Sequence, residues 1–89
     1  MDKHVHIKIS GRVQGIGFRF SIYEKMVELD LPKGRAENQQ DGSVLVDVEG
    51  PEDKLELLAE YCRRGPQGAR VSAVDISELA EPFIPLKNG

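Results

Sequence analysis

The chain has 89 residues, with 15 acidic and 12 basic side chains and a formal net charge of −3. This length predicts one small domain over residues 1–89, and the acidic balance argues against a general nucleic-acid binder, which usually carries a basic face. The single cysteine, Cys62, excludes a disulfide within the chain and a cysteine-rich zinc site, and fits a reducing compartment. No apolar run has the length of a membrane span and no signal peptide is visible, so we expect a cytoplasmic protein.

Residues 4–10 alternate between polar and apolar side chains, which predicts a half-buried strand. The apolar face consists of Val5, Ile7 and Ile9. The opposite face carries His4 and His6, which share a side of the strand as metal ligands would. Two histidines are weak evidence for a metal site, so we interpret both as part of a solvated polar face.

A glycine-rich stretch, GRVQGIGFR over residues 11–19, follows this strand. Glycines at a strand-to-helix turn leave backbone N–H groups free to meet an anion at the positive end of a helix. Arg19 adds a permanent charge and a donor fork that suits phosphate oxygens. The same pattern is compatible with a turn that only reverses the chain. It is neither a Walker A sequence nor a convincing dinucleotide fingerprint.

Apolar residues then recur with helical spacing from about Arg19 to Leu31. We interpret the whole stripe as core: Ile22, Tyr23, Met26, Val27 and Leu29. Pro32 is expected to end this helix, and Gly34 to adopt the left-handed conformation that redirects the chain.

The middle of the chain predicts a hairpin. Residues 35–39 form a weak strand, Asp41-Gly42 is a strong turn signal, and residues 44–49 form the return strand with alternate valines buried. Gly50-Pro51-Glu52-Asp53 then opens a second helix, because proline and acidic residues suit a first helical turn.

Cys62 falls on the inward stripe of this second helix and is interpreted as a small buried hydrophobe. Residues 70–77 predict a further strand, whose irregular apolar spacing suggests a bulge. Residues 83–86 are expected to add a short terminal strand, which Pro85 would confine to a sheet edge.

The resulting order, βαββαβ, predicts an α+β, ferredoxin-like split βαβ fold: an antiparallel sheet with two helices on one face and a possible short fifth strand. This fold carries many unrelated functions, so it does not by itself identify one.

The chain resembles the acylphosphatase family over nearly its whole length. Residues 11–19 resemble the family signature, and residues 34–38, GRAEN, stand where the family has Gly-Trp-Val-Arg/Lys-Asn. Further matching segments are the hairpin at residues 41–44, the second-helix entrance at residues 48–53, and the link to the last strand at Gly65-Pro66 and residues 69–71.

The resemblance implies hydrolysis of small acyl phosphates to a carboxylate and inorganic phosphate, without a metal, a cofactor or a phosphoenzyme. Arg19 matches the phosphate-binding arginine, and Asn38 matches the asparagine that holds the attacking water. The phosphate-binding loop corresponds to Gln14, Gly15, Ile16, Gly17, Phe18 and Arg19. A carboxylate leaves without needing a proton, so positioning and charge stabilisation suffice. The expected partners are the acyl phosphate and inorganic phosphate, as product or inhibitor, with no nucleic acid or membrane, and a monomer is expected.

Two residues depart from the family pattern. Arg35 replaces the usual tryptophan, and Glu37 replaces the usual basic residue before Asn38. On a strand Glu37 points away from the side that Asn38 faces, and an Arg35–Glu37 pair would offset its charge. Activity is therefore expected, with some weakening.

Two alternatives remain open at this level. The first is a module of the same fold that binds phosphate or an acyl phosphate with little or no turnover. The second is single-stranded RNA binding, because RNA-recognition domains share the βαββαβ order. Those domains stack bases on aromatic side chains of the sheet, and the outward positions here carry none.

Overall fold

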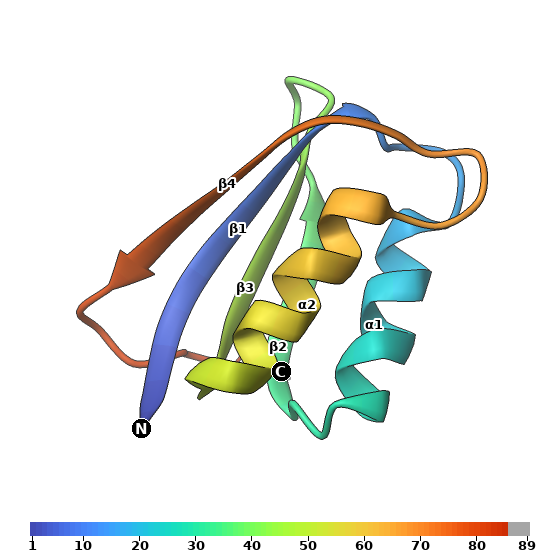
Figure 1. Ribbon diagram of the computed structural model, residues 1–89. Coiled ribbons are helices and arrows are strands. Elements are labelled where there is room, and N and C mark those ends of the chain that lie inside the picture. The colour runs from blue at the N-terminus through green and yellow to red at the C-terminus, as the bar shows by residue number, and fades with distance from the viewer. Residues whose placement is uncertain (86–89) are drawn as a thin grey trace.

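Two helices cover one face of a four-stranded sheet (Figure 1). The computed structural model describes residues 1–85. The elements are β1 (Asp2–Arg12), α1 (Phe18–Glu28), β2 (Lys33–Asn38), β3 (Val44–Pro51), α2 (Glu52–Arg64) and β4 (Arg70–Leu79). The strand order is β2-β3-β1-β4, and every neighbouring pair is antiparallel. The predicted ferredoxin-like arrangement is therefore confirmed.

The core lies between the helices and the helix-facing side of the sheet. Alternation along β1 and β3 brings their apolar side chains to this side, where they are almost fully buried against both helices. The largest buried side chains are Phe18, Ile7, Ile9, Ile22, Leu58, Val13, Val44, Val46, Val48 and Cys62. Neither helix within residues 1–85 has the length and apolar character that a membrane crossing requires.

The hairpin between β2 and β3 forms as predicted. Gln39 N donates to the Ser43 carbonyl at 2.8 Å, and Gly42 adopts a φ of 94° in the turn. The Ser43 hydroxyl and N–H both donate to Asp41, and Lys8 lies 3.0 Å from its second oxygen. These hydrogen bonds and the lysine hold the pKa of Asp41 well below its usual range. The turn that follows β2 is thereby fixed.

The end of α1 differs from expectation. Asp30, with a φ of 56°, adopts the left-handed conformation, whereas Gly34 does not. Asp is one of the residues that tolerate this region, and the N–H groups of Leu29 to Leu31 close the last turn. Gly34 is instead required by packing, since a Cβ there would lie 2.5 Å from Met26 Sδ.

The predicted core stripe of α1 is also too wide. Ile22 and Met26 are buried, but Val27 is 81% exposed and Tyr23 is 42% exposed. In the structure α2 covers only one side of α1, so Val27 is left in solvent and Tyr23 lies beside β2. Helical spacing alone could not show this.

The terminal strand is absent from residues 83–85, and Leu86 lies outside the described residues. The segment after β4 instead turns back and passes behind the sheet, across the face without helices (Figure 1). Phe83 N donates to Glu49 at 2.7 Å, and the Ile84 carbonyl accepts a hydrogen bond from Arg35. Local propensity predicted that this segment would be a strand. Side chains of β2 and β3 instead bind it across the face of the sheet, where it has no strand edge to pair with.

The two histidines are not a solvated polar face. His4 is only 9% exposed, because residues 81–83 cover it, and His6 is 35% exposed. Their acidic partner comes from β3, where Asp47 pairs directly with His6 in the register. Only the tertiary pairing of β1 with β3 brings the three side chains together.

Cys62 is confirmed as a buried residue, with no exposed surface. Burial raises the pKa of its thiol to about 12. We expect a thiol reagent such as DTNB to modify Cys62 in the folded protein at least about 100-fold more slowly than in the unfolded chain, because the thiolate is the reactive form. Absorbance measured with and without denaturant checks this. Equal rates in both conditions would contradict it.

Candidate functional site

A short loop between β1 and α1 forms one side of the site. Its ends are anchored in the core by Val13, 1% exposed, and Phe18, 2% exposed. Between them, Gly15 and Gly17 take positive φ angles of 78° and 79°. Gly17 is the N-cap of α1 and provides no side-chain cap. Among the hydrogen bonds of residues 1–85, none uses an N–H group from residues 14–18 as donor. These donors and the positive end of α1 therefore remain available to an anion.

The loop opens into a cavity of about 390 Å³ on the helix side of the sheet. The residues that line it are Val13, Gly15, Gly17, Phe18, Arg19, Phe20, Tyr23, Ala36 and Asn38. Arg19 is the only charged side chain in this set, and it forms no ion pair with any described residue. With the helix N-terminus beside it, the cavity is electropositive and suits an anionic ligand.

Arg19 and Asn38 reach this cavity from different elements. Arg19 belongs to the first turn of α1, and Asn38 is the last residue of β2. Asn38 shares the helix-facing side of β2 with buried Ala36, as the alternation predicted. Neither side chain is engaged in a hydrogen bond with another described residue, so the guanidinium and the amide are both free to bind substrate or water.

Gln14 and Ile16 do not line the cavity with their side chains. The Gln14 amide donates to the carbonyls of Gln39 at 2.8 Å and Ser43 at 2.9 Å, and Ile16 packs against the core. One amide thus fastens the loop to the turn that follows Asn38. Of these two residues, only the backbone N–H groups are left available to an anion at the loop.

Tyr23 lines the cavity, whereas sequence reasoning assigned it to the core. Its hydroxyl accepts a hydrogen bond from Ala36 N at 2.9 Å and lies 3.5 Å from the Ala36 carbonyl. Because β2 is an edge strand, this contact holds its free side against α1. The distance between the elements that carry Arg19 and Asn38 is therefore set in part by one tyrosine. The sequence did offer one signal for this role: Tyr23 is an aromatic residue with a polar hydroxyl, and it lies on the flank of the predicted apolar stripe.

The two departures from the family pattern lie outside the cavity. Arg35 and Glu37 face the side of the sheet without helices, where their charged groups are 3.6 Å apart. Arg35 also lies 3.1 Å from Asp47. The Glu37 charge is therefore directed away from the cavity and is partly offset, as predicted.

Comparison with known proteins supports the fold and the family resemblance. The acylphosphatase family model matches residues 5–83. The acylphosphatase of Salinibacter ruber is 44% identical over 84 residues, which cover 92% of this chain and 87% of that protein. The solved acylphosphatases of Coxiella burnetii and Bacillus subtilis superpose with TM-scores of 0.83 and 0.84, at 35% and 30% identity. They cover 89% and 92% of this chain, and the chain covers 82% and 89% of theirs.

The fold and the loop signature place this chain among small α+β proteins with an electropositive strand-to-helix cavity. It belongs to the acylphosphatase family, whose members are enzymes. The resemblance stated from residues 11–19 and 34–38 is confirmed.

Proposed function

We propose that the protein hydrolyses the carboxyl–phosphate bond of small acyl phosphates, with Arg19 and Asn38 as its catalytic residues. The observation that carries this proposal is that both side chains, from α1 and β2, line one cavity beside the free N–H groups of the loop. Family membership gives the reaction, and the electropositive lining supports binding of the phosphate group.

In this mechanism the phosphate lies against the N–H groups of residues 14–18 and the Arg19 guanidinium. The Asn38 amide orients a water for in-line attack on phosphorus. The bond from phosphorus to the acyl oxygen breaks, and the carboxylate leaves with the electron pair. A phosphate oxygen takes the proton from the water, giving a carboxylate and dihydrogen phosphate. Arg19 and the loop stabilise the equatorial oxygens throughout.

The reaction as proposed needs no metal, because the side chains around the cavity supply no carboxylate or imidazole ligand and the charge is provided by Arg19. We propose a monomeric enzyme. Its reduced, buried Cys62 suits the cytoplasm. Inorganic phosphate, bound at the same groups, is expected to be a competitive inhibitor.

The acyl group is proposed to lie against the aromatic rim of the cavity. Phe20 is 68% exposed and Tyr23 is 42% exposed, so both present ring surface beside Arg19. Benzoyl phosphate suits this rim and is the substrate for the first test. The test compares phosphate release by purified protein with release in buffer alone. Release no faster than in buffer, together with calorimetric binding of inorganic phosphate, would instead establish a binding module of the same fold.

Tyr23→Phe is expected to reduce kcat by about tenfold, because small displacements of a positioned group have large effects on rate. The loss of one hydrogen bond to β2 should lower stability by only about 1 kcal/mol. Steady-state hydrolysis and urea unfolding measure the two effects. The matched control is Tyr61→Phe on α2, the second of the two tyrosines, which should change neither. Unchanged kcat in Tyr23→Phe would show that the hydroxyl has no positioning role.

A further inference from the structure

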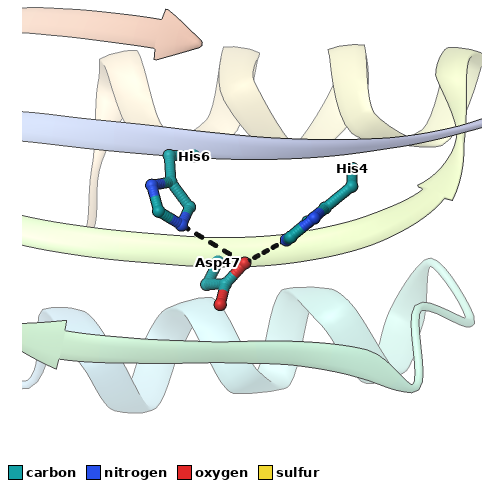
Figure 2. Close-up of side chains that lie close together, drawn as sticks. All are labelled: His4, His6 and Asp47. Carbon is teal, nitrogen blue, oxygen red and sulfur yellow. Dashed lines mark hydrogen bonds and ion pairs between the residues drawn. The ribbon is translucent and has the colours of Figure 1, made fainter. Parts of the chain in front are cut away.

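A cluster of two histidines and one aspartate lies on the side of the sheet opposite the helices. His4 and His6 project from β1 toward Asp47 on β3 (Figure 2). His6 is the cross-strand partner of Asp47 in the antiparallel register, and His4 follows on the same face. One ligand atom from each residue lies within 4.8 Å of the others. The cavity that contains Arg19 and Asn38 is on the opposite side, so the cluster is not used by the proposed reaction.

The hydrogen bonds of His4 fix the orientation of its ring in this cluster. Its Nδ1 lies 2.5 Å from the Glu81 carbonyl oxygen, which only accepts, so Nδ1 carries a hydrogen. Its Nε2 faces the Asp47 carboxylate, which also only accepts. Nε2 and Oδ1 are in direct hydrogen-bond contact, so an ion that binds both atoms must displace the shared proton and move the two atoms apart. His6 Nε2 approaches the same carboxylate oxygen, at 3.4 Å.

The residues around the cluster hold these groups in place. The second oxygen of Asp47 lies 3.1 Å from Arg35, which leaves Oδ1 directed at both histidines. The Phe83 ring packs edge-on against His4, with centroids 6.0 Å apart. Support of this kind, with the far nitrogen of a histidine bound to a backbone carbonyl, is characteristic of metal-ligating imidazoles. His6, at 35% exposed, leaves a route for an ion and a water.

We propose that His4 Nε2, His6 Nε2 and Asp47 Oδ1 bind a divalent transition-metal ion, with Zn²⁺ as the best-suited metal. Two imidazoles and a carboxylate are a ligand set that Zn²⁺ accepts at about 2.0–2.2 Å, with a water as fourth ligand. Imidazole nitrogens disfavour Mg²⁺ and Ca²⁺, which prefer oxygen. The ion would link β1 to β3 and, through the Glu81 carbonyl, to the segment that crosses the sheet.

Calorimetric titration of Zn²⁺ into the untagged, chelator-treated protein tests this proposal. The chain has two histidines and one fully buried cysteine, so a second imidazole or thiolate site cannot contribute. We expect one ion per chain, and a rise in Tm of about 10 °C when free Zn²⁺ exceeds Kd by about 100-fold. His6→Gln and Asp47→Asn should each weaken binding at least about tenfold. The control Asp75→Asn, which removes an exposed carboxylate from β4, should bind like wild type.

Two results would overturn the metal site. One is the absence of a saturable heat at submillimolar Zn²⁺. The other is equal affinity in wild type and His6→Gln; in either case the three side chains form only a hydrogen-bonded cluster. Co²⁺ gives a second readout, since its visible spectrum should indicate four-coordination in wild type and lose intensity in His6→Gln. Benzoyl phosphate hydrolysis by His6→Gln should match wild type, which separates this site from the proposed reaction.

Discussion

Arg19→Ala is expected to reduce kcat/KM for benzoyl phosphate by about 100-fold or more, the effect typical of removing one charge-stabilising donor from a transition state. Arg19 supplies the single charged side chain of the cavity lining, so no neighbour replaces it. Both binding and turnover should suffer, because the phosphate is charged in the ground state and in the transition state. Stability should hardly change, since Arg19 is exposed and unpaired among the described residues. Steady-state kinetics and thermal unfolding measure the two quantities.

The control for this variant is Arg63→Ala, which removes an exposed arginine from the last turn of α2 that does not line the cavity. Its activity should equal that of wild type. This result would exclude the change in net charge as the cause of the activity loss in Arg19→Ala. Asn38→Ala provides an independent check of the proposed roles. If the amide orients the water, kcat should fall while the inhibition constant for inorganic phosphate stays unchanged. An active Arg19→Ala enzyme would remove the guanidinium from the mechanism.

Gly11→Ala is expected to destabilise the protein by at least about 3 kcal/mol, although Gly11 lies outside the cavity. Its φ is 120°, a conformation that L side chains rarely adopt, and a Cβ would lie 2.2 Å from the Arg70 backbone oxygen. The register between β1 and β4 shifts at this point, from Ser10 paired with Ala73 to Gly11 paired with Val71. Urea unfolding measures the loss of stability.

Gly15→Ala is the matched comparison. Gly15 also has a positive φ, of 78°, but a Cβ there meets nothing within 4 Å, so only the conformational cost of about 1–2 kcal/mol remains. A Gly11→Ala variant as stable as Gly15→Ala would contradict this account of the bulge. The signature stretch therefore combines two functions: its first glycine permits close strand pairing, and its later glycines shape the loop.

Much of the fold followed from local pattern. The alternation at Val5, Ile7 and Ile9 predicted β1, and Asp41-Gly42 predicted the hairpin, because the same few interactions determine strands and turns in most contexts. The bulge suspected from the spacing in residues 70–77 is present where β4 pairs with the end of β1. The position of Asn38 on the helix-facing side followed from the same alternation.

What could not be predicted depends on contacts between distant segments. The role of Gly34 depends on its packing against Met26 and Val48. The burial of His4 depends on residues 81–83, and the position of Tyr23 depends on its hydrogen bond to β2. None of these is encoded by periodicity. The proposed catalytic roles came from resemblance, and the two side chains line one cavity. The cluster of His4, His6 and Asp47 became visible only when β1 and β3 were side by side.

The place of β1 in the sheet has a consequence for folding kinetics. This first strand lies between β3 and β4. Residue 4 must therefore pair with residues 49 and 79, which are distant in the sequence, before the hydrogen bonds of the strand are complete. Closing such long loops is entropically costly before any contact compensates it. Refolding should therefore take milliseconds to seconds rather than microseconds, and the strand pairing β1 to β4 should set the height of the barrier.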